Sequence, residues 1–370
     1  MESYHVHWRG MGRIAYFVSP HGFGHAARSC AVMEGLVRRR PAMRFDLFTE
    51  VPRWFFSESL PRCFTYHRLG SDVGLVQDSA LIENLEATVN RLDDSPLRDS
   101  SMIEALGRRL RQVGCKLVIS DISPLGLMVA DHLDLPSVLV ENFTWDWIYA
   151  NYPDAPPSLL RHGRAMAVAF ARANLRIQAT PVCEPGAEGI TVPPIARASR
   201  TPRSEVRRRL EVPADDSLVL LSMGGAGWDY GQLGELEHQD RVWIVVPGGG
   251  RTARRRGRLL VLPFHGEFYH PDLVAASDLV VGKLGYSTVA EAYHTGTAFA
   301  YVARPNFPES PVLASFVQQH MTAMEIEESA FRRGSWLQQI EPLLAVPRKR
   351  PETANGAEAA ANAILDFLSI

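Results

Sequence analysis

The sequence lacks three features that would place it in a specialised class. Its 370 residues include only four cysteines, spread singly, with no CxxC pair and no zinc-like spacing to histidine: Cys30, Cys63, Cys115 and Cys183. Such spacing favours buried thiols in a reducing compartment over a disulfide framework. No run reaches the roughly 18 apolar residues that span a bilayer, and residues 1–13 have no signal-peptide core. We therefore expect a cytoplasmic protein with no integral membrane segment.

An excess of charge of one sign is also missing. The formal net charge of −2 argues against a chain whose main role is to coat nucleic acid or an anionic membrane. With 46% apolar residues the composition is that of an ordinary globular protein, and the length suggests two domains with a core each. No nucleic-acid partner is expected.

What the chain does have is an alternation of short apolar runs with helical patterns, such as His25–Arg38 after Ile14–Val18. Several runs are apolar throughout, which predicts parallel strands covered by helices on both faces. The expected strands are Ile14–Val18, Phe45–Thr49, Leu117–Ser120, Ser137–Glu141 and Arg176–Ala179, and then Leu218–Met223, Val242–Val246, Leu259–Leu262, Leu279–Val281 and Ala298–Val302.

Prolines separate the two series. Pro193, Pro194 and Pro202 fall within residues 192–203, where no regular element should continue. We expect a Rossmann-like domain over residues 1–195 and a second Rossmann-like domain over residues 204–350. Residues 351–370 carry one apolar stripe and are expected to form a helix that packs back on the body.

A glycine-rich loop, residues 19–28, directly follows the first strand and carries two histidines. Ligands in open α/β sheets bind beyond the carboxyl ends of strands, and Asp121 follows another strand. A carboxylate there can orient His25 as a general base. His21 is expected to line the acceptor pocket, contact a phosphate or hold the loop, and Arg28 to reach into the cleft or pair with a carboxylate.

Two other interpretations of this loop remain open. His25 can be an ordinary helix-start residue that only satisfies backbone groups. Residues 22–27 also fit the G-x-G-x-x-A dinucleotide fingerprint, with Glu50 as the ribose-binding acid. That pattern alone is weak, and it leaves the paired histidines and a second glycine site unexplained.

The second glycine site lies in the other half. Backbone N–H groups of a glycine loop and of a helix start suit a diphosphate, and a lysine with two hydroxyls suits the same charge. One helical turn on, Glu291 is placed to accept hydrogen bonds from ribose hydroxyls, and Glu309 is placed to accept those of a sugar. The candidate donor-binding residues are Gly224, Gly225, Lys283, Gly285, Ser287, Thr288, Glu291 and Glu309.

An aromatic segment, residues 143–152, follows Asn142. Tryptophan faces next to polar side chains suit a sugar or a planar acceptor, so Asn142, Trp145 and Asp146 are candidate acceptor-binding residues. A helix packed into the core explains the same segment equally well.

Together these motifs resemble nucleotide-sugar glycosyltransferases of the GT-B fold. Residues 270–310 resemble the donor signature of family-1 UDP-sugar transferases, with lysine replacing histidine at 283, serine replacing asparagine at 287, and Glu309-Ser310 replacing Asp-Gln. The resemblance places Phe264 or His265 where a base stacks. The chain is also similar, over nearly its whole length, to the glycosyltransferase-like N-terminal half of plant L-arabinokinases, without their kinase half.

The resemblance implies an α/β protein with two Rossmann-like domains facing across a cleft. It implies an inverting glycosyltransferase that needs no metal or cofactor, takes a nucleotide-sugar donor, with a UDP-sugar favoured, and transfers to a hydroxyl-bearing acceptor. A nucleotide-sugar hydrolase of the same fold and a non-catalytic nucleotide-sugar-binding module remain as alternatives.

Overall fold

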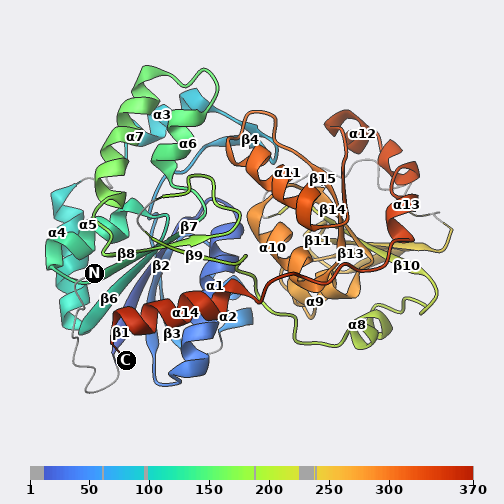
Figure 1. The fold of residues 1–370 in the computed structure, drawn as a ribbon, viewed down its shortest axis with the longest axis horizontal. Coiled ribbons are helices and arrows are strands. Elements are labelled where there is room, and N and C mark those ends of the chain that lie inside the picture. The colour runs from blue at the N-terminus through green and yellow to red at the C-terminus, as the bar shows by residue number, and fades with distance from the viewer. Residues whose placement is uncertain are drawn as a thin grey trace.

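The structure is a computed structural model that describes residues 12–60, 62–95, 99–186, 189–224, 237 and 240–369. Within these residues, strands form two seven-stranded sheets and one two-stranded sheet. Figure 1 shows the two large sheets side by side, each surrounded by helices. The expected α/β class with two largely parallel sheets is confirmed.

The first large sheet and its helices use residues 13–192. They comprise β1 (Arg13–Val18), α1 (Gly24–Arg39), β2 (Arg44–Thr49), α2 (Arg53–Ser59), β3 (Phe64–Arg68), α3 (Leu85–Asp93), α4 (Ser100–Gln112), β6 (Cys115–Asp121), α5 (Pro124–Leu133), β7 (Ser137–Glu141), α6 (Trp145–Asn151), α7 (Pro157–Phe170), β8 (Leu175–Ala179) and β9 (Ile190–Val192). The strand order is β3-β2-β1-β6-β7-β8-β9, and its pairings are parallel. β7 is buried along its whole length, because helices cover both faces.

The second large sheet repeats this plan. Its elements are α8 (Arg203–Arg209), β10 (Ser217–Ser222), β11 (Val242–Pro247), β12 (Arg254–Arg256), β13 (Leu259–Leu262), α9 (His270–Ala276), β14 (Leu279–Lys283), α10 (Tyr286–Thr295), β15 (Ala298–Val302), α11 (Glu309–His320), β16 (Ala323–Glu325), α12 (Glu328–Arg332), a 3-10 helix (Ser335–Gln338) and α13 (Glu341–Leu344). The order is β12-β13-β11-β10-β14-β15-β16, and only β12 runs antiparallel to its neighbour.

The strand order reverses once in each sheet, and both reversals matter for the site. In the first sheet β1 lies beside β6, with Val18 paired to Asp121. In the second, β10 lies beside β14, with Ser222 paired to Gly282. Crevices at such reversals, beyond the carboxyl ends of the strands, are where open α/β sheets bind ligands.

Two segments cross between the halves. α14 (Gly356–Phe367) leaves the second half and packs on α1, where Glu358 pairs with Arg38 and Arg39 (Figure 1). A hairpin of β4 (Gln77–Ser79) and β5 (Ile82–Glu83) extends from the first half toward α11 (Figure 1), and its turn buries Ala80 and Leu81 in the core of the second sheet. The halves are therefore tied together away from the linker as well.

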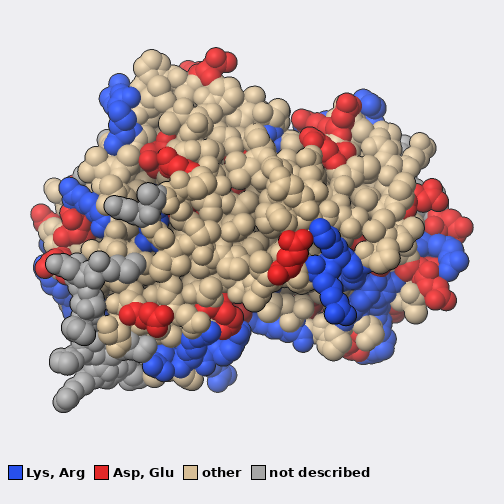
Figure 2. Space-filling model, in the orientation of Figure 1, with Lys and Arg blue, Asp and Glu red and all other residues tan. Residues whose placement is uncertain are grey.

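The surface carries mixed charge. Figure 2 shows Lys and Arg side chains interspersed with Asp and Glu on the face in view, with uncharged residues between them. In the part of the chain that is described, no helix has the length and apolarity needed to cross a bilayer.

Candidate active site

His25 and Asp121 meet where β1 and β6 lie side by side. The loop after β1 turns at Gly22, whose φ of +73° favours glycine, and places His25 in the first turn of α1. Its Nδ1 lies 2.9 Å from Oδ1 of Asp121 at the end of β6. The structure thus brings together His25, the expected general base, and Asp121, the carboxylate expected to orient it.

Arg28, one helical turn after His25, is buried beneath this pair. Its Nε donates to Asp121 Oδ2 at 2.8 Å and its Nη2 to Oδ1 at 2.6 Å, so one guanidinium binds both carboxylate oxygens. Burial alone would raise the pKa of Asp121, but Arg28 and His25 hold that pKa below its usual value. Asp121 is therefore a fully buried, ionised carboxylate.

His21 lies in the same loop and packs edge-on against Trp145, with ring centroids 5.0 Å apart. Its Nδ1 accepts a hydrogen bond from the backbone N–H of Leu75 at 3.4 Å. Burial, with the cations Arg304 and Lys283 nearby, lowers the pKa of His21 well below its usual value. A neutral ring with Nδ1 accepting carries its proton on Nε2, which makes Nε2 a hydrogen-bond donor.

In the second half, Gly285 is the N-cap residue of α10 and has no side chain to cap the helix, which leaves the first backbone N–H groups free to bind an anion. Gly282 allows β14 to approach β10, since a Cβ there would lie 1.8 Å from the carbonyl oxygen of Ser222. Lys283 follows. Its burial and, next in importance, the nearby cation Arg304 lower its pKa to about 7. Gly224 sits directly opposite the Lys283 side chain.

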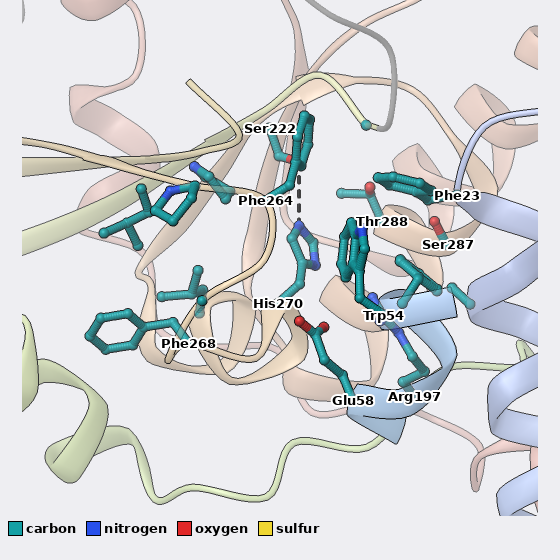
Figure 3. Close-up of a pocket in the computed structure, with 18 of the residues that line it drawn as sticks. Phe23, Trp54, Glu58, Arg197, Ser222, Phe264, Phe268, His270, Ser287 and Thr288 are labelled. Carbon is teal, nitrogen blue, oxygen red and sulfur yellow. Dashed lines mark hydrogen bonds between the residues drawn. The ribbon is translucent and has the colours of Figure 1, made fainter. Parts of the chain in front are cut away.

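An aromatic cavity of about 910 Å³, including its open mouth, lies between the halves. Figure 3 shows Trp54 and Phe264 around His270, with Ser287 and Thr288 beside Phe23. Glu58 and Arg197 also line it, and burial raises the pKa of Glu58 to about 7. Its aromatic lining comes from Phe23, Trp54, Phe55, Phe264 and Phe268.

A polar cavity of about 740 Å³ adjoins the aromatic one, and the two share Phe23, Gly224, Ser287 and Thr288. Its polar side chains come from both halves: His21, His25, Arg28, Gln77, Asn142, Lys283, Ser287, Thr288, Arg304 and Glu309. The start of α10 therefore stands at the junction of a space lined mainly by aromatic side chains and a space that contains His25.

Both glutamates that were expected to bind the donor already form hydrogen bonds with other side chains of the protein. Glu291 accepts from Arg197 Nε and lies against His270 Nδ1, each at 2.9 Å, so it stands behind two residues that line the aromatic cavity. Burial would raise the pKa of Glu291, but these two partners hold it below its usual value. Glu309 Oε1 accepts from Asn142 Nδ2 at 2.7 Å, and Oε2 accepts from Arg304 at 3.2 Å.

Trp145, Asp146 and His265 were expected in the site and do not line either cavity. Trp145 is fully buried in a core cluster and supports His21 from behind, and Asp146 lies on the same helix, α6. His265 has a mostly exposed side chain that packs against Trp54. Gly225 lies outside the described residues.

Several lining residues were not predicted. Arg197 falls in the stretch expected to be a linker, and Trp54 and Glu58 lie on α2, a helix without a motif. Two of them carried a sequence signal: His270 opens the stretch of residues 270–310 that resembles the donor signature, and Arg304 lies directly after β15. A cation following a strand end is such a signal.

Two Rossmann-like halves with cavities at their facing strand ends define the GT-B class of nucleotide-sugar glycosyltransferases. The chain belongs to Glycosyl transferase family 1, whose profile matches residues 12–331. The family resemblance expected from the motifs is confirmed.

Two other proteins are similar in sequence. The L-arabinokinase of Arabidopsis thaliana is 28% identical over 360 residues, which cover 94% of this chain and 34% of that protein. The chain thus spans about a third of the arabinokinase's length. An uncharacterized glycosyltransferase of Methanopyrus kandleri is 26% identical over 294 residues, 76% of this chain and 84% of that protein.

Solved structures share the fold at low identity. The calicheamicin glycosyltransferase CalG4 has a TM-score of 0.65 at 15% identity, over 97% of this chain and 98% of its own. A UDP-glucosyltransferase from Polygonum tinctorium has a TM-score of 0.60 at 13% identity, over 97% and 99%. These likenesses establish the GT-B fold.

Proposed function

We propose that this chain is an inverting, metal-independent glycosyltransferase that moves a sugar from a UDP-sugar to a hydroxyl of a small-molecule or glycan acceptor. Residues 1–195 bind the acceptor, and residues 204–350 bind the donor. The observation that carries the proposal is the junction of the two cavities at Gly224, Ser287 and Thr288, with His25 on the far side of that junction.

The donor fits this geometry in three parts. The nucleoside occupies the aromatic cavity, where Phe264 stacks on the base, and Glu291 acts on the ribose through His270, the lining residue that it orients. The diphosphate lies at the start of α10, against free N–H groups, Ser287, Thr288 and Lys283. The preference for uridine rests on the resemblance of residues 270–310 to UDP-sugar transferases.

The reaction takes place in the polar cavity. His25 removes the proton of the acceptor hydroxyl, whose oxygen attacks the anomeric carbon on the face opposite the diphosphate. The bond between the anomeric carbon and the diphosphate oxygen breaks, and the configuration inverts. Asp121 stabilises the imidazolium formed at His25, and Lys283 with the N–H groups of α10 stabilises the charge on the leaving group. His21 donates from Nε2 to the acceptor or sugar.

Thermal unfolding with UDP, dTDP, GDP and NAD tests the nucleotide site. A ligand at about a hundred times its Kd adds roughly 2.7 kcal/mol of stability, so the nucleotide that binds raises the midpoint measurably. A shift with UDP alone supports the proposal, whereas a shift with NAD alone overturns it. Free sugar released from the donor without any acceptor would assign the site to hydrolysis, and binding without turnover over many acceptors would assign it to a non-catalytic module.

A further inference from the structure

The carboxylate of Asp121 is the first member of a buried polar chain that runs from the first half into the second. Arg28 Nη1 donates to Asn142 Oδ1 at 2.5 Å, and Asn142 Nδ2 donates to Glu309 Oε1 at 2.7 Å. Glu309 in turn accepts from Arg304, which also donates to Glu83 at 3.3 Å. Every one of these side chains is almost completely buried.

The side-chain amide of Asn142 accepts a hydrogen bond through its oxygen and donates one through its nitrogen, to two different partners. A guanidinium can only donate, so Asn142 must turn Oδ1 to Arg28, and an ionised carboxylate can only accept, so Asn142 must turn Nδ2 to Glu309. Asn142 follows β7 in the first half, and Glu309 begins α11 in the second. This bond therefore joins the halves directly behind the base.

Arg28 lies close enough to His25 to compete with Asp121 for the ring nitrogen Nδ1. Arg28 Nη2 lies 2.6 Å from Asp121 Oδ1 but also 3.2 Å from His25 Nδ1. While Arg28 donates to Asp121, Nδ1 of His25 is free to donate to the same carboxylate, and Nε2 keeps the lone pair that a base needs. If Arg28 moved to donate to His25 Nδ1, the proton would sit on Nε2 and the base would be lost.

We infer that Asn142 is a positioning residue that, through Arg28, holds His25 in its basic tautomer only while it is bonded to Glu309 of the donor half. The inference rests on the proposed function, because it assigns a condition to the same base. The consequence is that the acceptor hydroxyl is deprotonated only when the two halves are closed on each other.

The hydrogen bond between residues 142 and 309 can be tested by exchanging its donor and its acceptor. In Asn142→Asp the new carboxylate repels Glu309 and is pushed away from it, so the anchor of Arg28 Nη1 is displaced and Arg28 can shift toward His25 Nδ1. In the double variant Asn142→Asp with Glu309→Gln, the introduced amide N–H donates to the introduced carboxylate, and the amide carbonyl still accepts from Arg304, so the link is rebuilt in the opposite direction. Glu309→Gln alone removes the same charge but sets its amide N–H against that of Asn142, so it breaks the link from the other side and should lower kcat as Asn142→Asp does.

We expect Asn142→Asp to lower kcat at least tenfold with the Kd for UDP changed less than twofold, and the double variant to recover to within about threefold of the wild type. A side chain that only stabilised the fold would lower the unfolding midpoint without this split between kcat and Kd. Wild-type kcat in Asn142→Asp, or a double variant no better than Asn142→Asp, would overturn the inference.

A second readout does not depend on turnover. ¹⁵N NMR of the histidine rings, with His25 assigned from the spectrum of His25→Ala, reports which ring nitrogen is protonated. We expect the Nδ1-protonated form in the wild type, a shift toward the Nε2-protonated form in Asn142→Asp, and its reversal in the double variant. An unchanged tautomer in Asn142→Asp refutes the inference even in a protein that transfers no sugar, and absence of transfer in the wild type counts against the proposed function alone.

Discussion

At the residue scale, the site is a set of charges held out of water by specific partners. Asp121 keeps its charge because Arg28 binds both of its oxygens. Glu291 keeps its charge because Arg197 contacts one of its oxygens and His270 the other. Lys283 differs, since among the described residues no hydrogen bond or ion pair is made by its ammonium group. A half-buried lysine side chain that bonds to no described residue is poised to receive an anion.

Replacing His25 with alanine should lower the rate of transfer by about 10²–10⁴-fold, the usual contribution of a general base. The Kd for UDP should stay within twofold of the wild-type value, because His25 lines the polar cavity and not the aromatic one. Initial rates and calorimetric titration measure the two quantities. His132→Ala, at an exposed histidine on α5, is the control, and retained activity in His25→Ala would remove the residue from the mechanism.

The affinity for UDP should fall as the pH rises above about 7. Burial lowers the pKa of Lys283 to about 7, so above that pH the free protein must take up a proton to bind the diphosphate with a charged lysine. The Kd should rise by up to about tenfold per pH unit between about pH 7.5 and 9.5, and calorimetry in buffers of different ionisation enthalpy should detect the uptake. Lys283→Met should abolish the slope, and a slope that persists in this variant would point to another group.

The same shift has a consequence for the ligand-free protein. Because an unfolded lysine keeps its proton up to about pH 10.4, the unfolded state binds more protons than the folded one between about pH 7 and that value. Lys283 therefore makes the free protein more stable as the pH rises through this range, and Lys283→Met should flatten that part of the stability curve.

At the element scale, the sequence predicted most of the strands and helices that carry the site. The runs Ser137–Glu141, Leu259–Leu262 and Ala298–Val302 were predicted to the residue, because buried parallel strands are apolar throughout. The hairpin of residues 77–83 was missed, since its strands are short and polar and only the turn is buried. The meeting of His25 with Asp121 was predictable from strand ends alone.

What the sequence did not reveal is how side chains pair behind the site. Asn142 was expected to face the acceptor, and Arg28 either to reach into the cleft or to pair with a carboxylate; the structure shows Arg28 paired with Asp121, but the bond from Asn142 to Glu309 was not foreseen. Their bonds to Asp121 and Glu309 depend on which rotamers the closed halves allow, and no pattern of spacing along the chain encodes this.

Gly282 and Gly285 offer a matched pair for separating folding from binding. A methyl group at 282 would collide with the carbonyl of Ser222 in the neighbouring strand, so Gly282→Ala should cost about 3 kcal/mol of stability. A methyl group at 285 meets no atom within 4 Å, so Gly285→Ala should lower the unfolding midpoint far less than Gly282→Ala, by no more than the small cost of alanine at an N-cap, while weakening UDP binding at the start of α10. Thermal unfolding with and without UDP measures both, and equal midpoints would contradict the close approach of β14 to β10.

At the scale of the whole molecule, the two halves share buried surface beyond the cleft. The largest core cluster contains residues of α1, α10 and α14, so it extends from one half into the other. The hairpin turn adds a second anchor in the core of the other sheet.

Leu81→Ala should therefore destabilise the protein by about 2–5 kcal/mol, the cost of truncating a buried leucine, although the residue belongs to a surface hairpin of the first half. Ile82→Ala at the neighbouring, 48% exposed position should change stability by no more than about 0.5 kcal/mol. Denaturant unfolding compares the two variants. Equal effects would mean that the turn is not inserted between the halves in solution.

The return of α14 to α1 makes the first half discontinuous in sequence. A chain cut within residues 193–202 would leave the apolar side of α1 exposed to water, and the severed piece would carry the complementary surface of Ala360, Ala361 and Ile364. Neither fragment is then a self-sufficient folding unit, so the two would have to be produced together and reassociate. A circular permutant that joins residue 369 to residue 12 and opens the linker would instead place α14 and α1 in one continuous fragment.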